Sequence, residues 1–524
     1  MLTGADVGPN LFLAQIAQAQ DGSKLSQEEI SAWDARNRVI DSWWDWFTGK
    51  ALEERDQSQP KNKAGEYPLK YPLQINPVRS AARLHAYALW GETQDTSEPL
   101  VKITCQPKED SDAARSLAAE ADEAILDVEY ENAARTQDLD MGLSSQALGG
   151  MVMKVGWDPT DINLPNGVRY EYYDPRSFHC RWRGKDYRNL WDAWIVLKIS
   201  KETALMYGVE LKQDGVYREY WGRGEHWIKI DDKVALNFKG EPLEGANPFG
   251  FVPFIYAPHE RANDFWGNSI VDASVIGIAK ELNSRDADIG DYVRSGVNSS
   301  LWIANNKSGY PVRKTLEDGQ SIYHLGRSLG NEPSPQMGRV EAPQLPEGAD
   351  KFSARLLESA RTTMSTPDIA YGKEEGTQRS GVTLYSRMWP MLAHVLQERG
   401  YWTEAKTIRA EMTLKILATM KRHEISDKHL GLHKRAKWYP MVPIDRQQLV
   451  EEVIRRRQEN AISDELMVEK FGDAADNKIE VGRIKEQEER VAELAAKSKL
   501  QQPVSNASNP QDAGLVGPGS GGKK

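Results

Sequence analysis

The 524-residue chain carries 67 Lys and Arg against 77 Asp and Glu, a formal net charge of -10. This balance argues against a protein that wraps nucleic acid over its whole surface, because such binders neutralise phosphates with Lys and Arg. Any DNA contact must therefore be local or deliberately weak. With only two cysteines, a disulfide framework is not expected. No apolar run approaches the roughly 18 residues that span a bilayer, and the apolar stretch 11–19 lacks the preceding basic region of a signal peptide. A reducing cytoplasm is therefore the default context.

The first 70 residues predict a helical attachment to the rest of the chain rather than a catalytic unit. Ser26 can cap a helix that we expect to reach Phe47, and a polar linker follows at 53–66. Four tryptophans fall in this helix, and packing into a core or an interface explains them most simply: Trp33, Trp43, Trp44 and Trp46.

Residues 71–266 mix helical and strand patterns and predict an α+β domain. A helix is expected over Val78–Trp90, ended by Gly91, and the composition of 113–147 is helical throughout. Alternating or β-branched segments predict strands at 100–105, within 149–159, and at 168–173, 190–199, 217–221, 226–230 and 251–256.

A long one-sided helix is expected over 267–299. Ser269 can cap its start, with Asp272 at the reciprocal capping-box position. Apolar residues recur at intervals of three, four or seven and mark one face, namely Val271, Val275, Ile278, Leu282, Ile289 and Val293. The opposite face is polar, with Ser274, Ser284, Asp288, Asp291 and Ser295. A helix with one apolar face needs a partner surface.

The segment 300–347 loses the helical period, because Gly and Pro divide it into short pieces. Leu301–Ile303 and Ser321–Leu325 have strand patterns. A second helix is expected over 348–366, and it must stop by Thr366 because Pro367 disfavours helical geometry in the residue before it. Its apolar face contains Phe352, Leu356, Ala360 and Met364. Two helices therefore flank a small module.

A polar loop with three glycines is expected at 367–381. The range 382–444 is expected to contain a long helix that kinks at Pro390 and can reach Lys421, followed by a return to the wing-like domain at 71–266. The pattern at 445–499 is helical and highly charged, with interruptions at Ile462–Asp464 and Phe471–Asp473. Residues 500–524 are Pro, Gly, Ser and Asn with little to bury, which predicts disorder.

Catalytic and cofactor motifs are weak in this sequence. His429 and His433 have the i, i+4 spacing of metal ligands, but Gly431 weakens the helix and no third ligand is placed. Gly222-Arg223-Gly224 lacks the context of a dinucleotide fingerprint, and Thr48-Gly49-Lys50 lacks the other residues of a phosphate loop. Glu374-Glu375 fits solvated loop charge better than a nuclease metal site. We therefore expect no enzyme activity, no cofactor and no metal, and the energy of any packaging motor would come from a partner.

Several short segments, in order, make residues 74–472 resemble the portal proteins of tailed bacteriophages, the head-to-tail connectors. Each is weak alone, and their order and spacing carry the resemblance: Ile75-Asn76-Pro77-Val78-Arg79; Gly149-Gly150-Met151-Val152-Met153-Lys154-Val155-Gly156-Trp157-Asp158-Pro159; Tyr173-Asp174-Pro175-Arg176-Ser177-Phe178; Phe251-Val252-Pro253-Phe254; Trp266-Gly267-Asn268-Ser269-Ile270; Ser380-Gly381-Val382-Thr383-Leu384; and Ile462-Ser463-Asp464-Glu465.

The resemblance implies an α+β portal fold with a mixed α/β wing, a long helical stem, a small α/β clip and a C-terminal helical crown, assembled as a twelve-fold ring. Carried onto this chain, these parts are a wing at 71–266, stem helices at 267–299 and 348–366, a clip at 300–347, a tunnel loop at 367–381 and a crown at 445–499. The segments 1–70 and 500–524 match no family feature.

The function so implied is a channel for DNA packaging and ejection at one capsid vertex of the virion, with assembly in the host cytoplasm. The implied partners are further copies of the chain, double-stranded DNA, terminase, the major capsid protein and a head-tail adaptor, with a scaffold protein as a further candidate and no membrane. A metal-dependent DNA-processing hydrolase stays as the alternative at this point.

Three groups of residues are candidates for function in such a ring. Loop residues Lys373, Gln378 and Arg379 would face DNA, and twelve copies would form a basic collar. Polar stem residues Ser274, Asp288 and Asp291 would form a mostly acidic wall to which DNA does not adhere, unless that face meets a neighbouring subunit or solvent. Clip residues Arg313, Lys314, Arg327 and Arg339 would contact acidic partners or passing DNA, or serve as ordinary surface charge.

Overall fold

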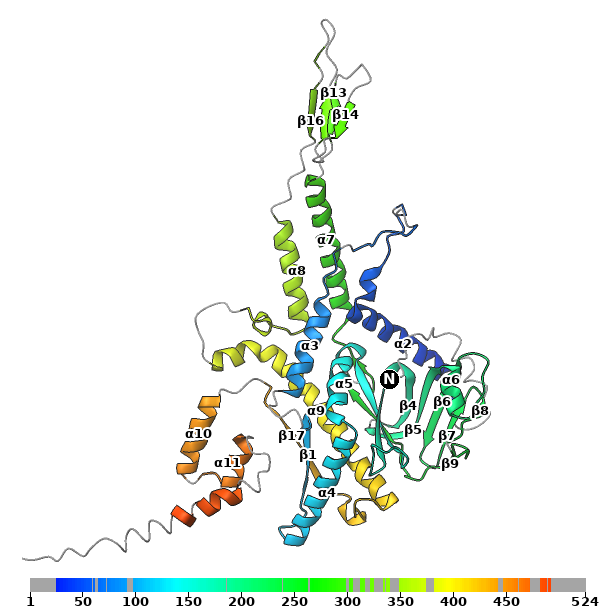
Figure 1. The fold of residues 1–524 in the computed structure, drawn as a ribbon, viewed down its shortest axis with the longest axis vertical. Coiled ribbons are helices and arrows are strands. Elements are labelled where there is room, and N and C mark those ends of the chain that lie inside the picture. Colours follow the sequence, from blue (N-terminus) through cyan, green and yellow to red (C-terminus); the bar gives the residue numbers. More distant parts are fainter. Residues whose placement is uncertain are drawn as a thin grey trace, which may run out of the picture. The chain divides into compact units, whose positions relative to one another are not determined.

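The computed structural model divides into two compact units, Met1–Pro443 and Ile444–Lys524, which are described separately. It describes residues 25–491 apart from 59, 62–64, 72, 92–97, 185, 238, 263, 298–300, 305–311, 316–320, 325–332, 335, 340–347, 374–380, 442–445, 460, 472–480 and 488. Helices and strands are both abundant, which confirms the α+β class (Figure 1). The predicted disordered tail at 500–524 lies outside the described residues.

The N-terminal helix α2 (Gln27–Thr48) packs on the first unit as an integral part of it. Ser26 and Glu29 form the capping box, and Gly49 ends the helix with a φ of 88°, a left-handed conformation that suits glycine. The Trp33 indole donates a hydrogen bond to the Arg176 carbonyl at 3.0 Å. Trp33 and Trp46 are buried in two different clusters, so the prediction of core packing for the tryptophans is right for this pair.

Four helices form the centre of the first unit: α3 (Pro77–Trp90), α4 (Asp112–Glu131), α5 (Ala134–Leu148) and α9 (Gly381–Met420). Trp90 on α3 and Trp402 on α9 are buried with ring centroids 5.0 Å apart. The helical composition expected over 113–147 is confirmed by α4 and α5, and the chain turns between them at Asn132 and Ala133. Asn132 donates its side-chain amide to the Val128 carbonyl at 2.9 Å, and Ala133 has a φ of 47°.

Two antiparallel sheets lie beside these helices, one of three strands in the order β10-β2-β3 and one of six strands in the order β4-β5-β6-β7-β8 with β9 on β7. Their strands are β2 (Gly150–Trp157), β3 (Val168–Tyr173), β4 (Phe178–Arg183), β5 (Asp186–Ile199), β6 (Gly215–Gly222), β7 (Glu225–Ile230), β8 (Lys233–Val234), β9 (Glu244–Ala246) and β10 (Phe254–Pro258). Short elements accompany them: η1 (Lys50–Glu53), η2 (Pro175–Ser177), α6 (Lys201–Met206), β11 (Glu260–Arg261) and β12 (Gly267–Asn268).

A separate two-stranded sheet joins β1 (Val101–Gln106) to β17 (His433–Trp438), over three hundred residues later in the chain. The pairing is antiparallel, from Val101 opposite Trp438 to Gln106 opposite His433. One face of this sheet packs on α4 and α9. The strand pattern of β1 is visible in the sequence, whereas β17 is not among the predicted strands.

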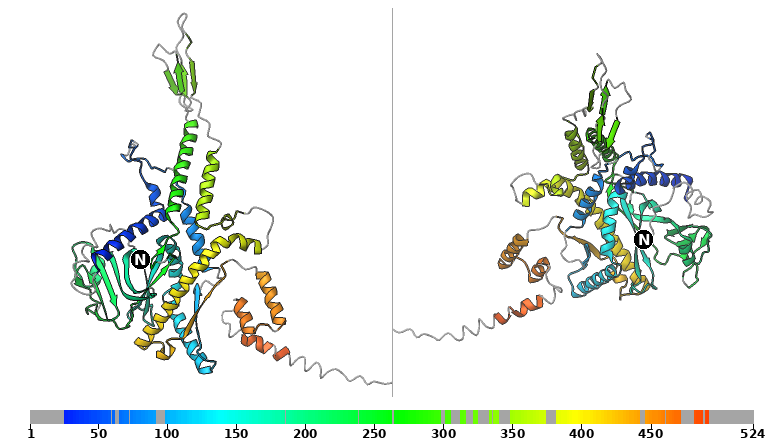
Figure 2. Two further views of the ribbon diagram at one scale, coloured as in Figure 1. Left: turned by 180° about the vertical axis from the view of Figure 1, so that it is seen from behind. Right: turned by 45° about the horizontal axis from the view of Figure 1, so that its top comes forward.

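Helices α7 (Ala273–Val297) and α8 (Ala349–Thr363) run side by side in Figures 1 and 2 and pack against each other. Four strands are inserted between them in the sequence and pair as two hairpin-like ladders, β13 (Leu301–Ala304) with β16 (Gln336–Arg339) and β14 (Val312–Thr315) with β15 (Ser321–His324). The two helices and two of the four strands agree with the predictions from sequence.

After α8 the chain forms a short 3-10 helix, η3 (Asp368–Tyr371), and then α9, which is 40 residues long and continuous through Pro390. The helix changes direction along its length, as the expected kink requires (Figure 1). A further 3-10 helix, η4 (Asp427–His429), precedes β17.

The second unit contains α10 (Arg446–Gln458) and α11 (Asp464–Phe471). The helices break where the sequence predicts, because Ser463 accepts a hydrogen bond from the Leu466 backbone at 3.2 Å and caps α11. Val453 and Val468 are buried between the two helices, and Arg457 pairs with Asp464 at 2.6 Å.

Candidate functional site

The first candidate feature is the base of α7, where the turn before the helix is hydrogen-bonded to the end of α5. The Ser269 hydroxyl donates to the Gln146 carbonyl at 3.0 Å and accepts from the Val271 amide at 3.0 Å. Asp272 caps α7 instead, through the Val275 amide at 2.7 Å. The predicted cap at Ser269 therefore lies three residues before the observed cap at Asp272, because the Ser269 hydroxyl is used in the turn that precedes the helix.

Two glycines from different segments of the portal-like pattern meet at this base. A Cβ on Gly267 would lie 2.1 Å from the Gly149 carbonyl oxygen, so no side chain fits. The Tyr256 hydroxyl bridges them, donating to the Gly149 carbonyl at 2.9 Å and accepting from the Gly267 amide at 3.0 Å. The start of β2 and the approach to α7 are thus held in one fixed arrangement.

Asn283 holds the middle of α7 to the segment before α3. Its side chain is fully buried and accepts from the Ile75 amide at 2.8 Å while donating to the Ile75 carbonyl at 2.9 Å. The next residue, Asn76, donates to the Trp46 carbonyl at 3.0 Å and caps α3 through the Arg79 amide. One dipeptide of the portal-like pattern therefore connects α2, α3 and α7.

The apolar side of the α7–α8 pair is buried in a cluster with α2 and α3. Its members are Trp46, Phe47, Leu52, Tyr71, Val78, Ala81, Ala82, Ala147, Ile270, Val271, Val275, Ala279, Ala360 and Met364. Of the apolar face expected on α8, Ala360 and Met364 lie in this cluster, whereas Phe352, nearer the other end, is 41% exposed. The pair is thus anchored at the end close to the body of the unit.

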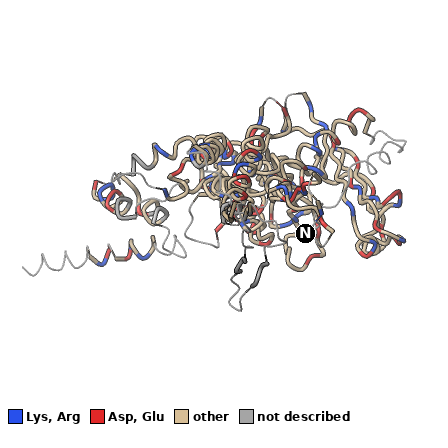
Figure 3. Tube along the Cα trace, turned by 90° about the horizontal axis from the view of Figure 1, so that it is seen from above, with Lys and Arg blue, Asp and Glu red and all other residues tan. Residues whose placement is uncertain are grey.

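The outer face of α7 is polar, and its three predicted candidates, Ser274, Asp288 and Asp291, are all exposed. The face is not uniformly acidic, because Arg285 pairs with Asp288 at 3.3 Å and with Glu281 at 2.8 Å. Lys and Arg positions are interspersed with Asp and Glu positions along the described chain (Figure 3). This internal neutralisation is predictable from the i, i+3 and i, i+4 spacing of the three residues, but it was not among the predictions from sequence.

The loop between α8 and α9 begins with ordered structure. The Arg361 guanidinium lies 4.6 Å above the Tyr371 ring and pairs with Asp368, which fixes η3 against the end of α8. Gly372 follows with a φ of 74° and Lys373 is exposed. A short 3-10 helix therefore occupies 368–371 within the expected polar loop. The other two loop candidates, Gln378 and Arg379, lie outside the described residues.

The strands between α7 and α8 carry three of the four basic candidates expected there. Arg313 and Lys314 lie in β14, opposite Tyr323 and Ile322 of β15, and Arg339 ends β16 opposite Leu301 of β13. The fourth candidate, Arg327, lies outside the described residues. The structure places the backbone of the three on two ladders.

A buried polar cluster that the sequence analysis did not anticipate connects the end of α8 to α3 and α9. His85 on α3 contacts the Met364 carbonyl through Nε2 at 2.9 Å. Its ring meets His394 edge-on at 5.2 Å, and His394 lies 5.1 Å from His259. The fully buried Glu398 carboxylate lies 3.4 Å from His259 Nδ1.

Burial sets the charge state of this cluster. Loss of hydration, together with the neighbouring imidazoles, lowers the pKa of His85 to about 3, and burial also lowers the pKa of His394. Although burial opposes ionisation of Glu398, the contact with His259 and the hydrogen bonds from Gln146 lower the pKa of that carboxyl group. His85 is therefore neutral at pH 7.

A second buried network, made of ion pairs, connects the C-terminal half of α9 to α4 and α5. Arg409 pairs with Glu129 at 2.5 Å and with Asp138 at 3.2 Å, and Lys406 also pairs with Asp138. Burial lowers the pKa of Lys406 to about 8. Such a network holds a specific alignment of helices, since removing one partner leaves a buried charge without compensation.

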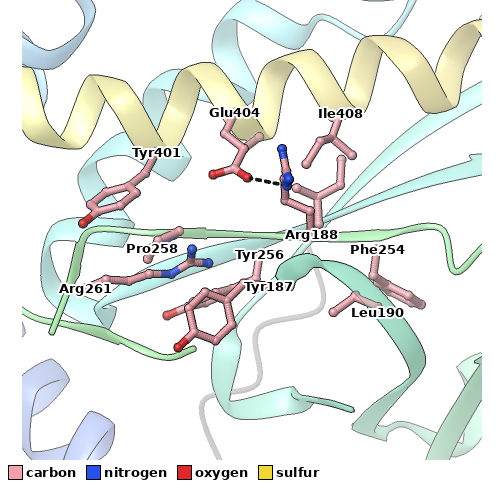
Figure 4. Close-up of a pocket in the computed structure, with 12 residues that line it drawn as sticks. Tyr187, Arg188, Leu190, Phe254, Tyr256, Pro258, Arg261, Tyr401, Glu404 and Ile408 are labelled. Carbon is pink, nitrogen blue, oxygen red and sulfur yellow. Dashed lines mark ion pairs between the residues drawn. The ribbon is translucent and has the colours of Figure 1, made fainter. Parts of the chain in front are cut away.

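A small pocket lies between β5, β10 and α9 (Figure 4). Arg188 pairs across it with Glu404 at 3.4 Å, and Arg261 lies 4.7 Å above the Tyr187 ring. Among the described residues that line it, the polar groups are arginines, tyrosines and one carboxylate already paired with arginine. Its described lining residues include no Ser, Thr, Cys or Lys, and its one carboxylate, Glu404, is paired with Arg188.

The residues considered for enzyme chemistry have other roles in the structure. His429 is buried and lies 3.0 Å from the Glu120 carboxylate, whereas His433 is exposed on β17. Gly49 ends α2, and Gly222-Arg223-Gly224 joins β6 to β7. Within the described part of the chain, no group of three or more His, Cys, Asp or Glu could hold a metal ion. Glu374-Glu375 lies outside it.

None of the described helices combines the length and apolar character that crossing a membrane requires. A family model described as "Phage portal protein, SPP1 Gp6-like" matches residues 96–494, which is most of the chain. A search of curated proteins found no match.

Proposed function

This chain belongs to the SPP1 Gp6-like family of phage portal proteins, and from that premise we propose that it assembles as a ring of twelve subunits around a channel for double-stranded DNA. A portal role in DNA packaging follows from family membership. The family is structural, so the hydrolase alternative does not describe this chain. Membership also implies a capsid vertex of the virion, where a head-connector oligomer contacts capsid and terminase.

The observation that carries the ring proposal is the α7–α8 pair. Two helices pack along each other, are anchored in one cluster at the base, and are separated in the sequence by a module of short strands. The exposed side of α7 lacks a covering element within the described unit. A polar helix face of this length suits a water-filled passage, where mixed and paired charges do not hold DNA tightly.

We assign the parts of the ring accordingly: a wing at 71–266, stem helices at 267–299 and 348–366, a clip at 300–347, a tunnel loop at 367–381 and a crown at 445–499. Ser274, Asp288 and Asp291 would line the channel along the stem. Lys373, with Gln378 and Arg379, would approach DNA from the loop. The clip residues Arg313, Lys314, Arg327 and Arg339 would meet the terminase and, later, the head-tail adaptor.

The net charge of -10 per subunit fits this proposal. Twelve subunits would bring about -120 charges, and tight Lys and Arg contacts along the channel would make DNA adhere through counterion release. Basic contact confined to one loop gives brief attachment instead. Assembly would take place in the host cytoplasm, with the major capsid protein and a scaffold protein as further partners.

The test is electron microscopy and native mass measurement of the purified full-length protein without nucleotide or metal. A ring of about 700 kDa, twelve times the 59.0 kDa subunit, is expected. A monomer at all concentrations would contradict the assembly proposal. A ring in which α7 and α8 lie on the outer rim would contradict the stem assignment alone.

A further inference from the structure

The exposed face of α3 presents two arginines and a tyrosine. Arg79, Arg83 and Tyr87 recur at every fourth residue, so their side chains lie along one side of the helix. All three are exposed, and Tyr87 is 71% exposed, whereas most of the other residues of α3 are buried. We call these three residues the α3 stripe.

The two arginines have no acidic partner in the described part of the chain. α3 contains no Asp or Glu, and neither guanidinium forms an ion pair or a hydrogen bond with another described residue. Arg38 and Arg285, by contrast, each pair with a carboxylate four residues away on their own helices. Because like charges at this spacing weaken a helix, Arg79 and Arg83 do not serve the stability of α3. Their charge is available to a partner.

Two exposed apolar side chains extend this surface past the start of α3. Ile75 is 38% exposed and immediately precedes Asn76, which caps α3 through the Arg79 amide. Leu73 is 50% exposed, and its Cδ1 atom would lie 3.3 Å from a Cβ on Gly290 of α7. We call the α3 stripe together with Leu73 and Ile75 the α3 surface. It runs from the side of α7 along α3.

The α3 surface is held in place by its connections to the stem helices. The buried Asn283 side chain accepts from the Ile75 amide at 2.8 Å and donates to the Ile75 carbonyl at 2.9 Å. Another side of α3 packs through Val78 and Ala82 into the cluster shared with α7 and α8, and α3 lies at the base of that helix pair in Figure 1. Because the surface is already formed, a partner that binds here pays little ordering entropy.

The composition of the α3 surface favours a protein partner over DNA. Arginine and tyrosine recur in the energetic centres of protein interfaces, and lysine is absent from this surface. DNA phosphates require cations and hydrogen-bond donors but no exposed leucine or isoleucine. The two guanidinium groups suit carboxylates, which bind them through two parallel hydrogen bonds. The fitting partner therefore carries Asp or Glu beside an apolar patch.

We propose that the α3 surface is the place where a neighbouring copy of this chain docks in the ring. The inference rests on the proposed function, because a closed ring needs a contact between two different surfaces of identical subunits. Each subunit has a net charge of -10, so two copies repel each other unless opposite charges face each other across their contact. Arg79 and Arg83 supply the positive side of that contact, and Tyr87 packs against the neighbour.

The first test measures the stability of full-length rings on dilution, by analytical ultracentrifugation. The variant Arg79→Glu with Arg83→Glu reverses the charge of the α3 surface. The subunit concentration at which half of the chains are in rings should rise about tenfold or more, because arginines at the centre of an interface carry much of its binding energy. Circular dichroism and melting of unassembled subunits should match the parent, since both positions are exposed.

Two matched variants separate the docking contact from the overall charge. Lys212→Glu with Lys239→Glu makes the same change in net charge at exposed positions outside α3 and should shift the half-assembly concentration much less. Arg79→Lys with Arg83→Lys keeps the charge but removes the planar guanidinium groups, so the stability of its rings should lie between those of the parent and the charge-reversed variant.

The second test identifies the occupant directly, with the photo-crosslinking residue p-benzoylphenylalanine in place of Tyr87. Irradiation of assembled rings should give a product of about 118 kDa, twice the 59.0 kDa subunit, in which position 87 of one copy is joined to a peptide of another. A crosslink found only within one subunit, or only to DNA or a different protein, would overturn the inference.

Rings of the charge-reversed variant that are as stable as those of the parent would also overturn it. That result would leave the proposed function intact, because the parent still assembles. A parent that forms no rings would contradict the proposed function itself, and this inference with it.

Discussion

His85 should make the folded subunit lose stability as the pH falls. The side chain is 1% exposed, and burial lowers its pKa to about 3, against about 6.5 in an unfolded chain. Because the folded pKa is the lower one, the unfolded state binds the proton more readily. The stability that depends on neutral His85 is complete above about pH 6.5 and is lost as the pH falls toward 3.

The size of the effect follows from these two values. At about pH 5 the unfolded imidazole is almost fully protonated and the folded one is not, so the loss is about 2 kcal/mol relative to neutral pH. The variant His85→Gln keeps an N–H group near the position from which Nε2 contacts the Met364 carbonyl, and it does not titrate. The free energy of unfolding of this variant should therefore fall about 2 kcal/mol less than that of the parent between pH 7 and pH 5.

The assay is urea unfolding of unassembled subunits at several pH values, followed by tryptophan fluorescence. His433→Gln is the matched control, because His433 is exposed on β17 and its removal should leave the pH dependence of the parent. Equal pH dependence in the parent and in His85→Gln would show that His85 is not held neutral by burial, and would refute the reasoning.

Three further outcomes are expected. Asn283→Ala should raise the exchange rate of the Ile75 amide roughly 30-fold, since two lost hydrogen bonds cost about 2 kcal/mol together, whereas the exposed Ser274→Ala should leave that rate unchanged. Replacing about 300–348 by a short linker should preserve the circular dichroism and melting of the remaining unit, because the segment is enclosed by two adjacent helices; melting of the sheets would contradict its assignment as a module. Lys373→Glu should slow DNA packaging while rings still form, and normal packaging rates would remove Lys373 from the DNA path.

Much of the helical structure could be predicted because its signals are local. Ser26 caps α2 as expected, and Gly91 ends α3 as expected. The start of α7 could not be placed, because Ser269 and Asp272 both suit a cap and only the tertiary contact of Ser269 with Gln146 decides between them. The residues around a helix terminus show which side chains could cap it, but they do not show which tertiary contacts those side chains make.

Features that depend on distant contacts were missed. The sequence of β17 is highly charged and does not have a clear strand pattern. Its pairing with β1 is evident only in the folded structure. The break at Ala133 occurs in a residue that favours helix, because Asn132 is held by the carbonyls of Val128 and Val168. The histidine cluster draws one residue each from α3, the end of β10 and α9, so no spacing in the sequence indicates it.

Among the predicted site residues, too, properties set by local sequence could be predicted and properties set by distant contacts could not. The exposure of Ser274, Asp288 and Asp291 followed from helical periodicity, which the structure confirms. The role of Arg285 between Glu281 and Asp288 was also accessible from spacing and was overlooked. Which face borders a channel depends on neighbouring subunits, and one chain does not contain that information.

The most direct test of the central claim is a reconstruction of the purified full-length protein by electron microscopy. We predict a closed ring of twelve subunits in which α7 lines the passage with its Ser274 and Asp288 side, and the loop 367–381 borders the narrowest point. A subunit that stays monomeric, or a ring whose passage is lined along its length by Lys and Arg from other elements, would contradict the account.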